Sequence, residues 1–515
     1  MNIGNILPHH ARFRPDHTAL ICGDQRFTYR ELNRSVNQIA NAIHASGIRK
    51  GDKVAMLLPN CRELWELYWA IARLGAVSVP LSPLLRGNGL RNQLNNADTA
   101  LLVTTESIAV HLDPVFDALR LRHNDVWLID AGEHHCYDSF YHHKHRASHE
   151  EPPEADIRPD DLYNIIYSSG TTGEPKGIMH THRIRAAYMM LFGSYYRMTP
   201  ECVILHSGSI IFNGSFLTTM PVMFLGGTFI LHENFDAENV VRTIKAERVT
   251  HTILVPSQIV AVLEQADFNG EKIASLEMIL SAGAPLHQKH KEEIDRRISG
   301  AFYELYGLTE GFVTILDKMD FHKKPGSVGC PPPFFELRIV DDEGRDLPPG
   351  EVGEILGRGP ILMAGYYKDP MRTRDAIRDG WLHSGDLGYV DEDGYLFLVD
   401  RKKDMVISGG VNVYPKDIES IVIEHPEVRE AAVFGVPDES WGEALVAAVV
   451  LKPSSGARSD ELESWVNERV DARFHKLKAV HIMADFPRNV AGKTLKREIK
   501  RHYLESGRGE MGVKG

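Results

Sequence analysis

Apolar and polar positions follow two different patterns in the N-terminal part of the chain. The segment TYRE, Thr28 to Glu31, has the spacing of a helix capping box, in which each end of the motif bonds to the backbone of the other. Apolar residues then recur at helical spacing, at positions 32, 36, 39, 40 and 43, until Gly47 ends the run. This pattern predicts an amphipathic helix.

Two short apolar runs flank a second helical pattern. VAMLL (54–58) and AVSVPL (76–81) have the length and residue types of buried strands, and the segment 63–74 between them is rich in Leu, Trp and Tyr. Strand, helix and strand in this order are typical of a parallel sheet covered by helices. We therefore predict an α/β fold.

Two other segments have an unusual composition. TMPVMFLGGTFIL (219–231) is apolar, but it is too short to cross a bilayer and a glycine pair interrupts it, so we interpret it as core. The segment 134–161 is rich in His, charged residues and Pro. A metal site there would need ligands at regular spacing on a helix, and none is evident, so we predict a solvated loop.

Composition limits the classes of function. A chain of 515 residues with 43% hydrophobic content is long enough for more than one domain. Its net charge of -12 argues against a nucleic-acid partner. The five cysteines are scattered and no CxxC occurs, which indicates reduced thiols and a cytoplasmic location. We see no export leader and no transmembrane segment, and expect neither.

The most distinctive loop is YSSGTTGEPKG (167–177), which directly follows the apolar strand predicted for 163–167. Its glycines allow the backbone to approach a ligand closely, and its amides and hydroxyls can surround an anion, so a phosphate chain is the expected ligand. It is not the nucleotide P-loop, because Lys176 is followed by Gly177 where that motif needs Ser or Thr. A plain Gly/Ser linker is the alternative interpretation.

This loop resembles the phosphate loop of the AMP-forming adenylating enzymes, the family of acyl-CoA synthetases, luciferases and peptide-synthetase adenylation domains. Further blocks follow in the order of that family: SAGAPL (281–286), ELYGLTE (304–310), the segment 381–415 and PRNVAGKTLKR (487–497). The resemblance covers nearly the whole chain and points to the acyl-CoA synthetase branch. It implies an α/β architecture with a large N-terminal domain of stacked mixed sheets with helices, residues 1–401, and a small mobile C-terminal α+β domain, residues 402–515.

The resemblance also implies an ATP site. Tyr306 would stack on adenine, Thr309 would meet the α-phosphate, Glu310 would hold Mg²⁺, and Asp386 with Arg401 would bind the ribose. Catalysis would depend on Lys493, Thr171 and Glu310, with Lys493 reaching the carboxylate and the α-phosphate. The full ATP-binding set implied is Ser168, Ser169, Gly170, Thr171, Thr172, Gly173, Lys176, Gly283, Ala284, Pro285, Glu304, Leu305, Tyr306, Gly307, Thr309, Asp386, Arg401 and Lys493.

Other positions match the acceptor site and the hinge of the family. Gly409 and Gly410 would lie along the pantetheine arm of coenzyme A, and Trp441, Phe474 and Lys476 would contact its nucleotide end. Relatives often carry Pro where this chain has Leu477, which puts the local CoA contact in question. Lys403 matches the hinge position between the two domains.

The acid pocket is predicted on weaker signals. HSGSIIFNGSF (206–216) replaces a block that carries a histidine or aromatic residue in many relatives, with Ile211 near the usual histidine position. The predicted pocket residues are Ile211, Phe212, Asn213, Ser281, Gly283 and Gly307. An apolar lining suits a medium- or long-chain fatty acid or an aryl acid, and no acidic residue offers itself to the ammonium group of an amino acid.

The expected function is therefore an ATP-dependent, AMP-forming acyl-CoA synthetase with ATP, Mg²⁺ and coenzyme A as cofactor and cosubstrates. Three alternatives stay open: loading of a carrier protein, luciferase-like oxygenation, and a nucleotide-binding relative without catalysis. The expected partners are small molecules only, and a homodimer is an open expectation.

Overall fold

The computed structural model describes residues 2–131, 136–168, 176–401, 404–408, 411–438, 441–453, 455–470, 472–488 and 494–506, apart from the side chains of Ser168 and Asn412. The chain divides into two compact units. Unit 1 comprises Met1–Phe321, Pro332–Glu336 and Arg358–Leu382, and unit 2 comprises His322–Pro331, Leu337–Gly357 and His383–Gly515. Each unit is described separately below.

Unit 1 contains two large mixed sheets. The strand order of the first is β18-β9-β8-β4-β3-β5-β6-β7. Its strands are β3 (Lys53–Leu57), β4 (Val77–Pro80), β5 (Thr99–Thr104), β6 (Val126–Leu128), β7 (Asp138–Ser139), β8 (Leu162–Ser168), β9 (Lys176–Thr181) and β18 (Gly365–Tyr366). β3 and β4 pair in parallel, as the strand–helix–strand pattern predicted. The apolar faces of these strands form one continuous core.

The second sheet of unit 1 has the order β15-β14-β13-β12-β10-β11-β1-β2. Its strands are β1 (Thr18–Cys22), β2 (Gln25–Thr28), β10 (Val203–His206), β11 (Thr228–Leu231), β12 (His251–Leu254), β13 (Met278–Ala282), β14 (Phe302–Gly307) and β15 (Val313–Leu316). The chain leaves β10 toward β11 and then crosses to β12 on the other side of β10. Such a reversal creates a crevice at the carboxyl ends of the strands, where ligands of open α/β sheets bind.

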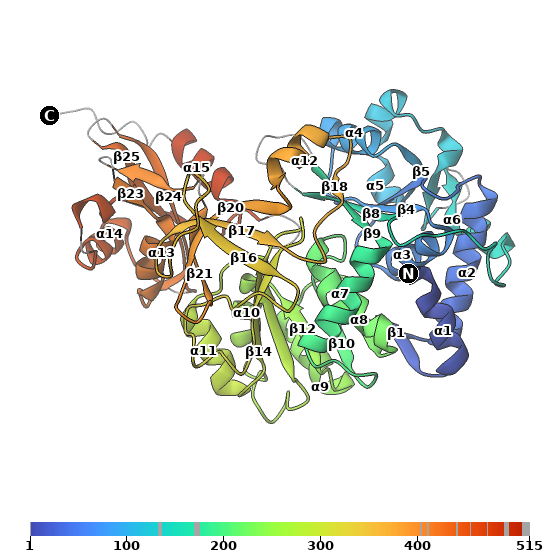
Figure 1. Cartoon of the computed structure of the whole chain (residues 1–515), viewed down its shortest axis with the longest axis horizontal. Helices are drawn as coiled ribbons and strands as arrows, with labels where there is room; N and C mark the ends of the chain where they lie inside the picture. The colour runs from blue at the N-terminus through green and yellow to red at the C-terminus, as the bar shows by residue number, and fades with distance from the viewer. Residues whose placement is uncertain are drawn as a thin grey trace. The chain divides into compact units, whose positions relative to one another are not determined.

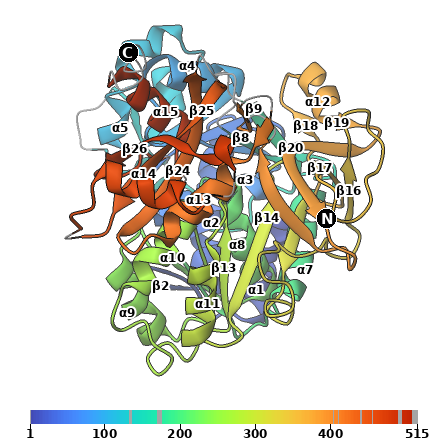
Figure 2. The ribbon, with the colours of Figure 1, turned by 90° about the vertical axis from the view of Figure 1, so that its left-hand side faces the viewer.

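Helices cover these sheets. In Figure 1, α7 and α8 lie side by side, and Figure 2 shows α10 and α11 beside β13 and β14. The helices of unit 1 are α1 (Ile6–Phe13), α2 (Tyr29–Ala45), α3 (Arg62–Leu74), α4 (Gly87–Asn96), α5 (Glu106–Ala109), α6 (Phe140–Arg146), α7 (His182–Tyr195), α8 (Phe216–Leu225), α9 (Ala237–Glu247), α10 (Pro256–Leu263), α11 (Gln288–Arg297) and α12 (Pro370–Ala376).

The predicted helix and core segments are confirmed. α2 begins at the predicted capping box, where Thr28 and Glu31 bond to each other's backbone. The apolar segment 219–231 forms most of α8 and all of β11, and its side chains are largely buried. Among the described residues, every helix is too short or too polar to cross a bilayer.

The prediction of a solvated loop for the His-rich segment is wrong for residues 140–146. These residues form α6, which contacts α2. Lys144 is buried and its Nζ lies 3.0 Å from Oε2 of the buried Glu66, while Arg62 binds the other oxygen of the same carboxylate at 2.7 Å. Because Glu66 lies far away in sequence, the local charge pattern could not show that this lysine is paired.

Unit 2 contains one complete sheet and most of another. One has the order β23-β22-β25-β24 with β26 beside β25, and the other has the order β16-β17-β20-β19 with β21 beside β20. Their strands are β16 (Glu336–Val340), β17 (Gly353–Arg358), β19 (Ile377–Arg378), β20 (Trp381–Val390), β21 (Leu396–Arg401), β22 (Val406–Ser408), β23 (Val411–Val413), β24 (Val428–Asp438), β25 (Gly442–Leu451) and β26 (Leu477–Met483). Helices α13 (Pro415–Glu424), α14 (Ser459–Asn467) and α15 (Lys496–Glu505) complete the unit.

The predicted fold class is confirmed: a large unit of mixed sheets with helices contains most of the N-terminal part of the chain, and a smaller unit of helices and strands contains the C-terminal part. The pair Asp393-Gly394, a typical hairpin-turn sequence, joins β20 to β21, with Gly394 at φ +82°. The compact unit 2 also includes residues before 401, because β20 and β21 pair within it. The proposed boundary at 401/402 therefore stays a prediction about the hinge.

Candidate active site

The strands on either side of the predicted phosphate loop form a hairpin. β8 and β9 are antiparallel, with Tyr167 opposite Gly177 and Ser168 opposite Lys176. A side chain at Gly177 would come within 2.8 Å of Ile165 Cγ2, so glycine is needed for this pairing. The loop residues Ser169, Gly170, Thr171, Thr172 and Gly173 lie outside the described residues. The structure thus fixes the two ends between which the loop runs.

Tyr366 brings two predicted site residues of unit 1 together. Its hydroxyl donates to Glu310 Oε1 at 2.8 Å, and Lys176 Nζ lies 5.5 Å from the centre of its ring. Burial and the Glu310 carboxylate raise the pKa of Tyr366, so the phenol stays a donor. The sequence analysis did not identify Tyr366, which stands beside Tyr367 in the segment GYYKDP.

The Thr309–Gly311 segment is held by its own backbone. The carbonyl of Glu310 accepts from Met363 N at 2.8 Å, and Gly311 N donates to the carbonyl of Leu308 at 3.0 Å. Gly311 has φ +109°, and a Cβ there would lie only 2.0 Å from the carbonyl oxygen of Ile361. Only glycine fits this position, so the backbone of the preceding Glu310 is held by main-chain contacts.

The two predicted adenine segments lie next to each other. β13 and β14 are parallel neighbours, with Ser281 opposite Glu304 and Ala282 opposite Leu305. The strands therefore deliver Gly283, Ala284 and Pro285 to the same edge as Tyr306 and Gly307. Gly283 has φ +92°, and Tyr306 is half-buried. The two segments therefore lie at one edge of the sheet, and their role in binding adenine stays a prediction.

Glu304 has a contact that the sequence did not reveal. Its carboxylate forms an ion pair with Lys291 of α11, and both side chains are buried. A buried carboxylate is stabilised by such a cationic partner, so this ion pair gives the Glu304 side chain a structural role.

The predicted acid-pocket segment is anchored by polar contacts from other elements. The side-chain amide of Asn60 makes two hydrogen bonds to this segment. It donates to the Gly208 carbonyl at 2.6 Å and accepts from Ile210 N at 2.9 Å. Tyr188 accepts from Asn213 Nδ2 at 3.0 Å. Ile211 and Asn213 are buried and Phe212 is half-buried. Asn60 and Tyr188 are supports that sequence analysis did not identify.

In unit 2 the two residues predicted to bind the ribose lie in contact with each other. Asp386 on β20 and Arg401 on β21 are direct cross-strand partners, and Arg401 Nε lies 3.1 Å from Asp386 Oδ1. The Asp386 side chain is mostly buried, whereas the Arg401 side chain is 41% exposed. A carboxylate oriented by a guanidinium in this way can accept from the two hydroxyls of a ribose.

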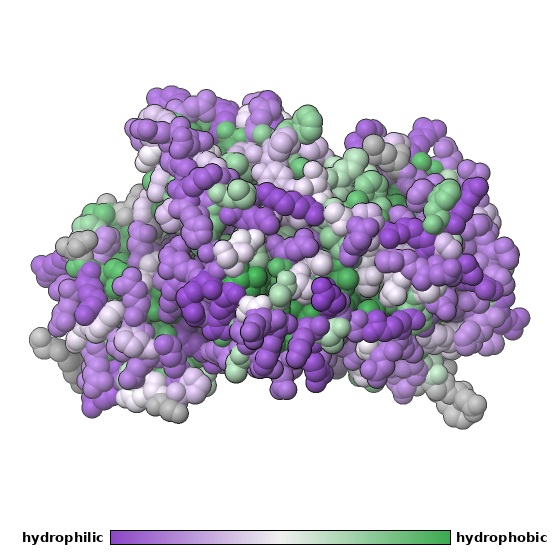
Figure 3. Space-filling view, turned by 90° about the horizontal axis from the view of Figure 1, so that it is seen from below, coloured by the Kyte–Doolittle hydropathy of each residue, from purple (hydrophilic) through white to green (hydrophobic). Residues whose placement is uncertain are grey.

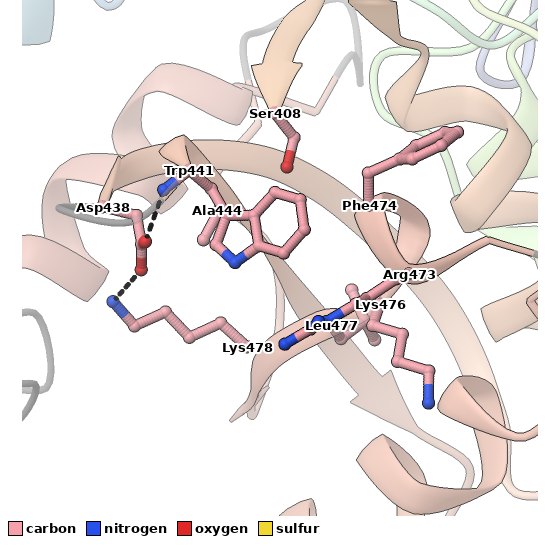
Figure 4. Close-up of a pocket in the computed structure, with 9 residues that line it drawn as sticks. All are labelled: Ser408, Asp438, Trp441, Ala444, Arg473, Phe474, Lys476, Leu477 and Lys478. Carbon is pink, nitrogen blue, oxygen red and sulfur yellow. Dashed lines mark hydrogen bonds and ion pairs between the residues drawn. The ribbon is translucent and has the colours of Figure 1, made fainter. Parts of the chain in front are cut away.

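Unit 2 also contains a pocket of about 240 Å³ that includes all three residues predicted to contact the nucleotide end of CoA. Trp441 and Phe474 provide aromatic walls, and Arg473 lies over the Trp441 ring at 5.5 Å (Figure 4). Asp438 accepts from Trp441 N at 3.1 Å and from Lys478 Nζ at 2.9 Å. The full lining is Ser408, Asp438, Trp441, Ala444, Arg473, Phe474, Lys476, Leu477 and Lys478.

Arg473 and Lys478 were missed, although they flank Lys476 in the basic segment RFHKLK. Leu477 of the same segment has a hydrogen bond that proline could not make. Leu477 N donates to Asn467 Oδ1 at 2.7 Å, and Asn467 Nδ2 donates back to the Leu477 carbonyl at 3.0 Å. The departure from the family pattern at this position therefore has a local structural reason.

Four predicted residues of unit 2 lie outside the described residues: Lys403, Gly409, Gly410 and Lys493. The segment that contains Lys493 starts and ends at paired residues, because Arg488 and Thr494 form an antiparallel bridge and Arg488 NH1 donates to Thr494 Oγ1 at 3.2 Å. Within the described part of the chain, no group of His, Cys, Asp and Glu side chains forms a ready metal cage.

Comparison with known proteins shows the family of this chain. The AMP-binding enzyme family matches residues 7–367, and the C-terminal domain of AMP-binding enzymes matches residues 417–493. The chain belongs to the AMP-binding enzyme family. It is 35% identical to a feruloyl-CoA synthase of an Amycolatopsis species over 502 residues, covering 96% of this chain and 97% of that protein.

Other AMP-binding enzymes show the same similarity along their whole length. An indoleacetate–CoA ligase of Aromatoleum aromaticum is 32% identical, covering 97% of this chain and 98% of that protein. The long-chain-fatty-acid–CoA ligase FadD13 of Mycobacterium tuberculosis is 32% identical, covering 98% of each chain.

Solved structures agree as well. ATP-bound MatB from Rhodopseudomonas palustris superposes with a TM-score of 0.88 at 29% identity, covering 98% of this chain and 100% of that one. The anthranilate CoA ligase AuaEII with anthranoyl-AMP gives 0.90 at 25% identity, covering 99% and 98%. The predictions of family, fold class and acid–thiol ligase activity are thereby confirmed.

Proposed function

We propose that this AMP-binding enzyme joins a hydrophobic aryl or medium- to long-chain fatty acid to coenzyme A through an acyl-AMP intermediate, using the residues named above. The observation that carries this proposal is that both units present side chains suited to the required chemistry. Unit 1 presents Lys176, Tyr366 and Glu310 beside the ends of the phosphate loop. Unit 2 has a pocket lined by aromatic and basic residues.

In the first half-reaction, an oxygen of the acid attacks the α-phosphorus of ATP, and the bond to pyrophosphate breaks. This step brings two anions together, so donors and cations must already be in place. We assign this role to the loop residues 168–173, to Lys176, Thr309 and Lys493. Tyr306 with the 283–285 segment would hold the adenine, and Asp386 with Arg401 the ribose.

Glu310 suits a magnesium ion. Its carboxylate accepts one hydrogen bond from Tyr366, which orients it and leaves its other oxygen available. Mg²⁺ prefers one or two carboxylates together with phosphate oxygens and water, and a dedicated protein cage is not needed. When bound, the ion would neutralise charge on the phosphates. Glu310 would hold it, and Tyr366 would keep the carboxylate oriented.

In the second half-reaction, the thiol sulfur of CoA attacks the acyl carbon, the bond to AMP breaks, and the thiol proton leaves to solvent. Trp441 and Phe474 offer flat faces for a base, and Arg473, Lys476 and Lys478 offer charge for phosphates. Gly409 and Gly410 would lie along the pantetheine arm. This basic aromatic pocket favours CoA over a carrier protein as acceptor, since a carrier protein needs no adenine site.

Lys403 would act as the hinge between the domains 1–401 and 402–515, so that the small domain serves both half-reactions. We also propose a cytoplasmic location, because all five cysteines are free. A homodimer is the expected assembly to test by sedimentation.

The acid class follows from the relatives and from the pocket segment. Two of the reported relatives are named for aryl acids and one for long-chain fatty acids. Ile211, Phe212 and Asn213 would line the pocket together with Ser281, Gly283 and Gly307. They offer no carboxylate for an ammonium group, so amino acids are excluded as good substrates.

The test is AMP release with ATP, Mg²⁺ and CoA over a graded panel of hydroxycinnamic, indole, branched and straight-chain acids. We expect CoA-dependent AMP release with at least one aryl or fatty acid. Pyrophosphate exchange without thioester formation would favour the carrier-protein alternative. Nucleotide binding without pyrophosphate release for any acid would contradict the proposal.

A further inference from the structure

Arg185 is the most unusual charged residue of unit 1. It lies on α7 with no exposed surface, and its guanidinium is 4.3 Å from the centre of the Phe216 ring and 4.7 Å from that of Tyr188. Its described hydrogen-bond partners are neutral: Nε donates to Asn164 Oδ1 at 3.1 Å, and NH2 lies 3.2 Å from His180 Nδ1. A buried cation without a carboxylate is costly, so its retention calls for a specific role.

The contact with His180 fixes the state of that imidazole. A guanidinium has only donors, so His180 Nδ1 must be the acceptor and the ring proton must be on Nε2. Nε2 lies 2.9 Å from the carbonyl oxygen of Thr309 and therefore donates to it. Burial and the Arg185 charge keep the pKa of His180 well below its usual range, so the ring stays neutral.

This chain of contacts ends at the segment proposed to meet the α-phosphate and Mg²⁺. His180 belongs to β9, the strand that leaves the phosphate loop, and Thr309 directly precedes Glu310. Met363 N and the close packing of Gly311 hold the following residues. The carbonyl of Thr309 accepts a hydrogen bond from His180, which links this segment to β9.

We propose that Arg185 is a positioning residue for acyl-AMP formation, and that it acts by fixing the His180 tautomer that holds Thr309 in place. The inference rests on the proposed function. Arg185 is fully buried beneath Tyr188 and Phe216, so it acts through His180 and does not touch ATP. Without its donor, His180 could move the proton to Nδ1, and Nε2 would then repel the Thr309 carbonyl.

The test compares Arg185→Met, His180→Leu, His180→Gln and the Met/Leu double variant by pyrophosphate exchange. We expect Arg185→Met and His180→Leu each to lower kcat for acyl-AMP formation by about ten-fold, the scale of one hydrogen bond to a charged group. The KM for the acid should change little. The double variant should be no slower than His180→Leu, because both changes break one chain of contacts. His180→Gln should recover part of the rate, since its amide can donate to Thr309.

The control is Arg183→Met, which removes a surface arginine of the same helix that pairs with Asp160 at 2.8 Å. It should leave kcat unchanged. If Arg185→Met does not fold, Arg185→Lys carries the same test, because it keeps the charge but loses the fork of donors.

Three results would overturn the inference. The first is a loss in the double variant equal to the product of the two single losses, and the second is no recovery of rate with His180→Gln. The third is a loss of rate that varies strongly from acid to acid, which would mean that Arg185 acts in recognition of the acid. A wild-type enzyme that forms no acyl-AMP with any acid would instead refute the proposed function.

Discussion

Several polar groups of unit 1 and those of the proposed CoA pocket in unit 2 are organised in opposite ways. Glu310 is half-buried and bonded to Tyr366, while the pairs Glu304 with Lys291 and His180 with Arg185 are buried. Arg473, Lys476 and Lys478 expose their side chains to solvent around an open pocket. Fixed, buried groups suit the stabilisation of a transition state, whereas exposed charges suit reversible capture of a charged ligand.

On the face shown in Figure 3, hydrophilic residues predominate and apolar residues form only small areas between them. Single exposed apolar side chains such as Phe13 and Met319 are ordinary for a folded protein. The contrast between buried, paired groups in unit 1 and exposed charges in unit 2 can be tested by mutation.

The largest effect is expected from Glu310→Gln. It keeps the acceptor for Tyr366 but removes the charge, so acyl-AMP formation should slow by about two to three decades, the typical effect of losing one group that stabilises the transition state. Conversion of added acyl-AMP to the thioester should change much less. Pyrophosphate exchange and thioester assays measure the two steps, and the exposed Glu271→Gln serves as control. Equal losses in both steps would contradict the assignment.

Lys493→Ala sharpens the comparison, because this residue of unit 2 is predicted to serve the first half-reaction. We expect a similar loss, about two to three decades in acyl-AMP formation, with transfer from acyl-AMP spared. Lys500→Ala, on the neighbouring helix α15, should behave like wild type in the same two assays. Loss confined to thioester formation would reassign Lys493 to the CoA site.

Sequence reasoning succeeded where one local pattern decides the structure. The capping box at Thr28 and the turn at Asp393-Gly394 were predictable because their hydrogen bonds and backbone angles depend on a few adjacent residues. Asp386 and Arg401 pair across two strands, whereas their role at the ribose came from the family resemblance and stays a prediction.

Sequence reasoning failed where partners are far apart in the chain. Lys144 pairs with Glu66, Tyr366 bonds to Glu310, and Asn60 anchors the segment after β10. No local spacing encodes these contacts, since they exist only after the strands are ordered in the sheets. Lys144 is instructive because its charged neighbourhood predicted exposure and the structure buries it.

A moderate effect is expected at the exposed site. Lys476→Ala should raise the KM for CoA about five-fold at low ionic strength, equivalent to ~1 kcal/mol, with little change in kcat for acyl-AMP formation. The difference should shrink as salt is added, because exposed charges are screened. The measurement is KM for CoA at several salt concentrations, with Lys272→Ala as control. A salt-independent effect would show that Lys476 acts as a desolvated group.

The smallest effect is expected for Leu477→Pro, and it concerns stability. The substitution removes the N–H that donates to Asn467, so the free energy of unfolding of unit 2 should fall by about 1 kcal/mol. Leu477→Met keeps the N–H and nearly the same volume and should cost less. Urea denaturation compares the two variants, and an equal loss for both would show that side-chain packing matters more than the hydrogen bond.

The backbone clamp at Gly311 has a consequence for redesign. A main-chain oxygen occupies the space that any side chain would need there, so a substitution at Gly311 would displace the backbone next to Glu310. The segment 211–213 is tethered independently, by Asn60 and Tyr188. A library that varies residues 211–213 can therefore be screened for activity on new acids without changing the backbone around Glu310.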